Sequence, residues 1–215
     1  MRGGAATAAT YAALDGPADG ALDFALVDTH CHLDADAFED ETTTDLLGRA
    51  RRAGVTRLVT IGTDLAASAR AVRLARHHHE VWATVGIDPN DLPIDGTPLT
   101  SGMLAEVEAL ARSPRVVGIG EIGLDYYWNR TTHLIQRAAF EDQLALARRL
   151  ELPVVIHSRD ADADTEAVLA AWAAGHPWRR ASGDEPWRRV AAARRHALLR
   201  RRRARWPSAT SSSAS

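Results

Sequence analysis

The sequence predicts an α/β protein whose fold class is an incomplete TIM (β/α)8 barrel, with about five βα units followed by an irregular or helical basic tail. Between residues 24 and 175, short apolar runs alternate with segments of helical periodicity. Apolar and polar residues do not alternate regularly within these runs, which is typical of parallel strands buried on both faces. Polar side chains gather where several of these strands end. A doubly wound sheet fits the first two observations, but the third favours a barrel, because barrel enzymes collect functional groups at that end.

The expected elements follow from local patterns. Each strand is a short run rich in Val, Ile, Leu or Thr, and these runs are residues 24–30, 56–62, 81–87, 115–123 and 153–157. Each helix has apolar residues at helical spacing, and these segments are residues 42–54, 64–79, 101–113, 132–150 and 162–174. A closed barrel needs eight strands, and only five are indicated. We therefore expect unpaired edges on the first and fifth strands, with exposed apolar inner faces.

The charge distribution divides the chain into unlike regions. Residues 1–175 hold 15 Arg against 26 Asp and Glu, whereas residues 176–215 hold 11 Arg against 2 acids. We expect a disordered leader over 1–22, a partial barrel over 23–175 and an aberrant Arg-rich tail over 176–215, disordered or partly helical. The tail is interpreted as an out-of-frame or aberrant end. The alternative is a basic arm whose arginines and tryptophans bind nucleic acid.

Several classes of protein are excluded or disfavoured by composition. The single cysteine, Cys31, rules out an intramolecular disulfide and fits a reducing compartment. No run approaches the roughly 18 apolar residues that a membrane span needs. The leader lacks a strong apolar core, so a signal peptide is not expected. The cytoplasm is therefore the expected location.

The segment "VDTHCHLD" carries the first chemical signal. Side chains alternate along a strand, so His30 and His32 project to one face and Cys31 to the other. Two imidazoles on one face can bind one metal ion, and Asp28 or Asp34 can orient them. The alternative is a pair of ordinary polar residues at a strand end.

Two later segments add similar signals. Glu121 ends an apolar strand among glycines in "GIGEIGLDYYW", where small neighbours leave room for an ion or a substrate. His157 ends the strand of "PVVIHSRD" and is followed by Arg159. Alone, the first could be a glycine-rich turn and the second a structural histidine. Three such signals on different strands of a parallel sheet indicate one shared site.

The motifs "DTHCHLD", "VGIDP", "GEIGLDYY" and "PVVIHSRDA", in this order, resemble the TatD family of metal-dependent deoxyribonucleases among the amidohydrolase-like barrels. The resemblance covers about residues 24–175. It implies that His30 and His32 hold one divalent ion and that Glu121 bridges it to a second ion held by His157. Glu121 and His157 would thereby be catalytic. The ions would be Mg²⁺, Mn²⁺ or Zn²⁺, and they would activate a water for attack on the phosphodiester.

The resemblance also implies a substrate and its contacts. The expected partner is DNA, as single strands or 3′ ends, cleaved in the manner of a 3′–5′ exonuclease; no motif indicates a protein partner. Arg159 is a candidate phosphate clamp because its planar fork suits phosphate oxygens. Tyr126, followed by Tyr127 and Trp128, either stacks on bases or roofs the barrel. Asp88 stands where the family usually has a histidine, and is expected to affect substrate choice.

The chain departs from the family at its end, because motifs like "HCFSG" and "ETDSP" are absent. Each ion is therefore expected to lose a ligand, leaving the second with only Glu121 and His157, and activity is expected to be impaired. One alternative is a catalytically dead fragment or nucleic-acid-binding remnant. Another is an amidohydrolase acting on C–N or lactone bonds, although the chain has no lysine for the metal-bridging role common in those enzymes.

Overall fold

The structure is a computed structural model that describes residues 25–34, 42–128 and 130–174. These residues all belong to one compact unit of the chain, Met1–His176. The expected leader, residues 1–22, and the expected tail, residues 176–215, lie outside the described residues. In the described part of the chain, no helix is both long and apolar enough to cross a membrane.

Five strands and five helices alternate along the described chain, as the sequence predicts. The strands are β1 (Leu26–Cys31), β2 (Val55–Ile61), β3 (Val81–Val85), β4 (Val116–Asp125) and β5 (Val154–Arg159). The helices are α2 (Thr43–Arg52), α3 (Leu65–His77), α4 (Ser101–Ala111), α5 (His133–Arg149) and α6 (Asp162–Ala174). The main difference is at β4 and β5, each of which continues two residues beyond its expected end.

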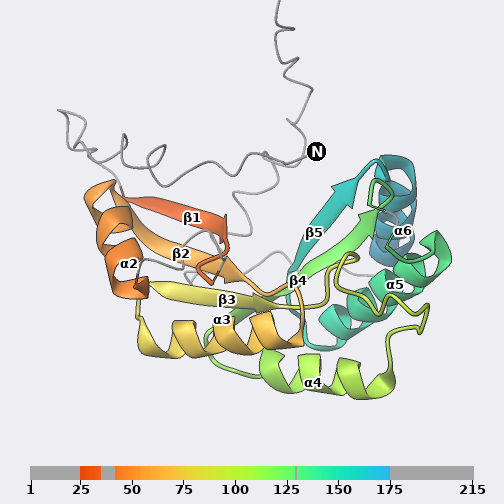
Figure 1. Cartoon of the computed structure of the whole chain (residues 1–215), viewed down its shortest axis with the longest axis horizontal. Coiled ribbons are helices and arrows are strands. Elements are labelled where there is room, and N and C mark those ends of the chain that lie inside the picture. Colours follow the sequence, from red (N-terminus) through yellow and green to blue (C-terminus); the bar gives the residue numbers. More distant parts are fainter. Residues whose placement is uncertain (1–24, 35–41, 129, 175–215) are drawn as a thin grey trace, which may run out of the picture. The chain divides into compact units, whose positions relative to one another are not determined.

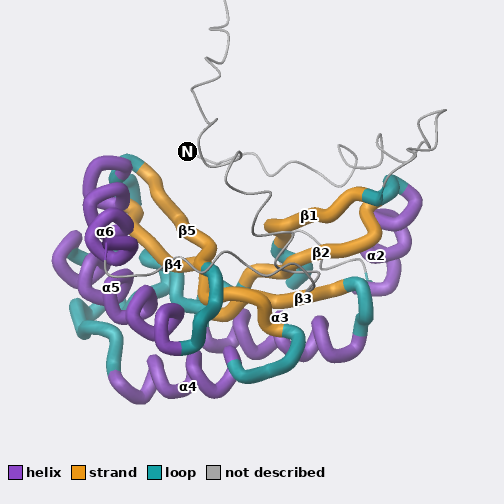
Figure 2. The backbone as a smooth tube through the Cα atoms, turned by 180° about the vertical axis from the view of Figure 1, so that it is seen from behind, coloured by secondary structure: helices purple, strands orange, loops and turns teal. Residues whose placement is uncertain are grey.

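The five strands form one parallel sheet in the order β1-β2-β3-β4-β5. Sequential order with a helix between neighbours is the arrangement of a (β/α) barrel, whereas a doubly wound sheet reverses its order. The helices lie on one face of the curled sheet, as Figure 1 and the view from behind in Figure 2 show. The described part of the chain is therefore an incomplete barrel of five strands, and β1 and β5 are its edge strands.

Four helices begin with a side-chain cap. The caps of α2, α3, α4 and α5 each accept a hydrogen bond from the main-chain N–H three residues on, and they are Thr42, Asp64, Thr100 and Thr132. Each cap satisfies an N–H that would otherwise have no partner in the first turn. The helix starts are therefore encoded locally, by residues close to each start in the sequence.

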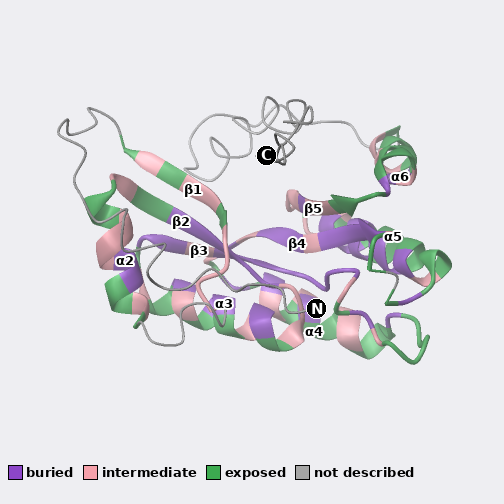
Figure 3. Cartoon of the chain, turned by 45° about the horizontal axis from the view of Figure 1, so that its top comes forward, coloured by how far each residue is buried: buried purple, intermediate pink, exposed green. Residues whose placement is uncertain are grey.

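The main core lies between the sheet and its helices, and it includes Val85, Ile119 and Phe140, each with no exposed surface. Figure 3 shows that buried residues concentrate in β2, β3 and β4, while β1 and β5 carry more exposed ones. A smaller cluster holds Val59 and Ile61 of β2 together with Val155 of β5. Of these, only Val155 belongs to a strand that was expected to expose its apolar inner face, and it is buried.

Candidate metal centre

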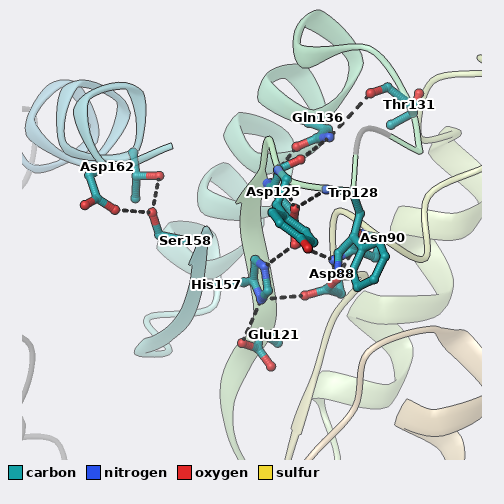
Figure 4. Close-up of polar contacts among 12 residues, drawn as sticks. Asp88, Asn90, Glu121, Asp125, Trp128, Thr131, Gln136, His157, Ser158 and Asp162 are labelled. Atoms are coloured by element: carbon teal, nitrogen blue, oxygen red, sulfur yellow. Dashed lines mark hydrogen bonds and ion pairs between the residues drawn. The ribbon is translucent and has the colours of Figure 1, made fainter. Parts of the chain in front are cut away.

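Polar side chains from four strands or the loops after them converge on one place. His30 belongs to the end of β1, Asp88 follows β3, Glu121 lies within β4 and His157 lies within β5. Figure 4 shows one ring nitrogen of His157 near both Glu121 and Asp88, and the other near Asp125. Because all five strands are parallel, residues far apart in sequence meet at the same end of the sheet.

Close approach of β4 and β5 depends on two glycines. Gly120 and Gly123 have φ values of +148° and +150°, a region that side-chain-bearing residues rarely adopt. A Cβ at Gly120 would overlap the main chain of Val155, and one at Gly123 would overlap the main-chain oxygen of His157. The glycines thus let Glu121 and His157 approach from neighbouring strands.

The first group of possible metal donors is His30, His32 and Glu121, whose ligand atoms lie within 4.8 Å of one another. The two imidazole rings pack edge to face with centroids 5.3 Å apart, and His30 Nε2 lies 3.4 Å from Glu121 Oε2. Cys31 points elsewhere, since its thiol donates to the carbonyl of Val59. Burial and nearby aspartates raise the pKa of the Cys31 thiol to about 12, so it remains a neutral thiol.

The second group is Asp88, Glu121 and His157, again with ligand atoms within 4.8 Å. His157 Nδ1 lies 3.4 Å from both Asp88 Oδ2 and Glu121 Oε1. Sequence reasoning placed only Glu121 and His157 here and considered Asp88 for its effect on substrate. Its position just after an expected strand already put Asp88 at this end of the sheet, and the structure adds that its carboxylate lies within 3.4 Å of His157 Nδ1.

Glu121 stands between the two groups. One of its oxygens faces His30 and the other faces His157, each at 3.4 Å. Burial raises the pKa of Glu121, but hydrogen bonds from His157 and His30 outweigh it and bring the pKa to about 2. The carboxylate is therefore ionised at neutral pH and offers an oxygen to either side.

His157 is held from both ring nitrogens. Its hydrogen bond to Glu121 raises its pKa to about 9, together with the charges of Asp88 and Asp125 and against the effect of burial. On the far side of the ring, Nε2 donates to Asp125 Oδ2 at 2.9 Å. Asp125 is fully buried, and this contact fixes a proton on Nε2 and directs Nδ1 at the two other carboxylates.

Asn90 links the two aspartates of the site. Its side-chain amide donates to Asp88 Oδ1 and to Asp125 Oδ2, each at 3.0 Å, and its main-chain N–H donates to Asp88 Oδ1. Burial nevertheless raises the pKa of Asp88. With Oδ1 satisfied by Asn90, it is Oδ2 of Asp88 that faces the site.

Two buried glutamines of α5 hydrogen-bond the main chain that carries this network. Gln136 accepts from the N–H of Asp125 and donates to its carbonyl, at 2.8 and 2.9 Å. Gln143 does the same for Ile87, at 2.8 and 2.9 Å. The two lie seven residues apart, on one face of the helix. Each clamps the main chain at or beside an aspartate of the site, a role that sequence reasoning missed.

The expected substrate residues divide into two sets. Tyr126 donates its hydroxyl to Asp164 at 2.7 Å and stacks on His133, so its ring and hydroxyl are both engaged within the protein. Burial and Asp164 raise its pKa to about 12. Arg159 is exposed and lies over the rings of Tyr127 and Trp128. The structure therefore sets Tyr126 apart from the exposed group that Arg159 forms with its two neighbours.

The donor sets fit divalent cations, since two carboxylates and three imidazoles face one another at ligand distances. A family model, "TatD related DNase", matches residues 27–182. The chain belongs to the TatD related DNase family.

Individual relatives agree with this membership. The chain is 35% identical to "Uncharacterized metal-dependent hydrolase YabD" of Bacillus subtilis, over 67% of this chain and 54% of that protein. It is 41% identical to "3'-5' ssDNA/RNA exonuclease TatD" of Klebsiella pneumoniae, over 60% of this chain and 47% of that protein. Among solved structures, YJJV, a TatD homologue from Escherichia coli, matches with a TM-score of 0.60 and 30% identity, over 68% of this chain and 56% of that one. The chain spans about half the length of these relatives.

Of the residues that sequence reasoning proposed for the ions, all four fall in the two donor groups, namely His30, His32, Glu121 and His157. The residues it missed are Asn90, Asp125, Gln136 and Gln143. The motif "GLDYY" contains Asp125, but nothing in its spacing indicates a contact with an imidazole 32 positions away.

Proposed function

We propose that this TatD family chain is a metal-dependent hydrolase that cleaves phosphodiester bonds in nucleic acid, with single-stranded DNA attacked from the 3′ end as the substrate. The observation that carries the proposal is the position of the Glu121 carboxylate. Its Oε2 lies 3.4 Å from His30, and its Oε1 lies 3.4 Å from His157. A shared carboxylate between two donor groups suits a pair of cations that act on one phosphate. The printed names of the relatives, metal-dependent hydrolase and ssDNA/RNA exonuclease, support the same class.

In this proposal His30, His32 and Glu121 would hold one cation, and Asp88, Glu121 and His157 would hold the other. Bound divalent cations supply neutralisation of phosphate charge and a lowered pKa of water. Three protein donors on each side leave coordination positions for water and substrate, as catalytic sites require. The oxygen-rich second group suits Mg²⁺ or Mn²⁺, whereas two imidazoles in the first group also suit Zn²⁺.

The protein's own groups then have separate tasks. Asp125 keeps the Nε2 proton of His157 in place, so that Nδ1 is the atom presented to the site. Asn90 holds Asp88 and Asp125 at a fixed spacing through one amide. Arg159 binds a phosphate of the strand through its free N–H edges, because its guanidinium face is occupied by the aromatic rings.

The test is hydrolysis of a 5′-labelled single-stranded oligonucleotide by the full chain with Mg²⁺ or Mn²⁺, followed by gel analysis of the products. Stepwise shortening from the 3′ end is expected, and a 3′-blocked oligonucleotide should resist. Glu121→Gln should abolish cleavage and weaken Mn²⁺ binding, whereas Glu166→Gln, an exposed change on α6, should alter neither. Cleavage that continues in EDTA or in the Glu121→Gln variant would overturn the proposal. The wild-type rate also measures the impairment expected from the sequence.

A further inference from the structure

An exposed aromatic pair lies beside the metal centre. Tyr127 and Trp128 follow β4 directly and are 54% and 55% exposed, which is unusual for large rings. Their rings meet edge to face with centroids 5.0 Å apart. The preceding residue, Tyr126, is engaged with Asp164 and His133, so the exposed pair is not part of that packing.

The pair is fixed to the centre by one carboxylate. Asp125 Oδ1 accepts from the main-chain N–H groups of Tyr127 and Trp128, each at 2.9 Å, while Oδ2 accepts from His157 Nε2. Figure 4 shows the contacts that Asp125 makes on both sides. The main chain that carries these two rings is therefore held at a set place relative to the donor groups, because the fully buried Asp125 contacts both.

Arg159 adds a cation to the pair. Its guanidinium carbon lies 3.8 Å from the ring centroid of Tyr127 and 5.5 Å from that of Trp128. Within the described residues, no carboxylate forms an ion pair with this guanidinium. Stacking on a ring leaves the in-plane N–H groups of a guanidinium directed outward, where they can reach a phosphate.

We propose that Tyr127, Trp128 and Arg159 form a binding platform for one nucleotide of a single-stranded nucleic acid, with its base stacked on Trp128 and its phosphate on Arg159. The inference rests on the proposed function, since it assumes a nucleic-acid substrate. An aromatic face beside a cation matches the two parts of a nucleotide, the flat base and the charged phosphate. A duplex hides its base faces, so the platform selects unpaired strands.

The platform is tested by binding, without turnover. A fluorescein-labelled single-stranded oligonucleotide is titrated with the full chain in EDTA, and anisotropy gives the Kd. Trp128→Ala should weaken binding roughly 5- to 150-fold, the range for loss of one base–aromatic stack. Trp128→Phe should retain most of the affinity, because it keeps a stacking face. Ile94→Ala, which removes an even more exposed apolar side chain from another loop, should have no effect.

A cycle with modified oligonucleotides separates stacking from a structural role. Each base in turn is replaced by an abasic site, and we expect one position near the 3′ end to weaken wild-type binding. In Trp128→Ala, the same abasic site should have no further effect, because the stacking partner is already gone. Equal effects of the abasic site in both proteins would overturn the platform, even if cleavage occurs. An abasic-site effect that is present in the wild-type chain and absent in Trp128→Ala would support the platform. If metal-dependent cleavage were also absent, the proposed hydrolysis would be contradicted. Failure of the wild-type chain to bind any single strand in EDTA would overturn the platform, and the cleavage assay with Mg²⁺ or Mn²⁺ would still decide the proposed hydrolysis.

Discussion

His157 makes the stability of the metal-free chain depend on pH. Its pKa is raised from 6.5 to about 9, chiefly by its hydrogen bond to Glu121. A group with a raised pKa in the folded state contributes stability that is complete below 6.5 and is lost as the pH rises through 9. The linkage relation gives a loss of about 2.5 kcal/mol between pH 6 and pH 8.5, and solvent screening at the ring, which is 24% exposed, reduces it to about 2 kcal/mol.

The measurement is urea unfolding of the metal-free full chain in EDTA at half-unit steps from pH 6 to 8.5. The upper limit matters because the pKa of Cys31 and of Tyr126 is about 12 in the folded chain. Both groups ionise on unfolding at higher pH and would add their own destabilisation. Within the chosen window they keep their protons in the folded state, and the dependence on His157 dominates.

Two variants decide whether His157 is the cause. His157→Gln should lower stability at pH 6 and flatten the profile toward pH 8.5, because no proton is left to lose at that position. His77→Gln, at the exposed end of α3, should keep the wild-type profile, since His77 contacts the carbonyl of Arg73 and not the site. A profile of equal slope in wild type and His157→Gln would refute the reasoning, as would a pKa near 6.5 for His157 by NMR.

Three further outcomes are expected. Asp125→Asn should weaken Mn²⁺ binding about 10- to 100-fold by calorimetry while circular dichroism stays unchanged, because the partner that orients His157 is no longer charged. Gln143→Leu should cost roughly 3 kcal/mol in urea unfolding, because it leaves the buried N–H and carbonyl of Ile87 without their partners. Gly123→Ala should cost about 3 kcal/mol or more by the same measurement, since φ there is +150° and the new Cβ would overlap β5. An unchanged affinity in the first case, or an unchanged unfolding midpoint in the others, would contradict the contacts described.

The sequence predicted those features that depend on residues close together in the chain, such as alternation along a strand and spacing along a helix. Alternation predicted that His30 and His32 share a face. Both offer ligand atoms to the donor group with Glu121, while the Cys31 thiol donates to Val59 on β2. Helical spacing of apolar residues located the helices to within a few residues. Family resemblance supplied the idea of a shared carboxylate at Glu121, and its two oxygens do face the two histidine-bearing strands.

Contacts formed only in three dimensions were not predictable. The strand-end position of Asp88 placed it near the site, but its contact with His157 needed the structure. Asp125 reaches His157 because β4 continues beside β5 to the pair Asp125 and Arg159. Gln136 and Gln143 are polar residues on the buried face of α5. Helical periodicity predicts apolar residues at such positions, so it gives no reason for a glutamine there. Only the main-chain groups that they meet explain why they are there.

The hydrogen bonds of Gln136 and Gln143 to the main chain hold the second donor group in place, and no glutamine of this kind holds the first among the described residues. The loop with Asp88 and the end of β4 are both tied to α5, so the second donor group opens only if that helix separates from the sheet. His30 lies in a stretch of β1 where the strand register is irregular, and β1 has β2 as its neighbour at the sheet edge. Amide hydrogen exchange should therefore be faster around His30 than around Asp125. The ion held by the histidine pair would be the one that this chain gains last and releases first.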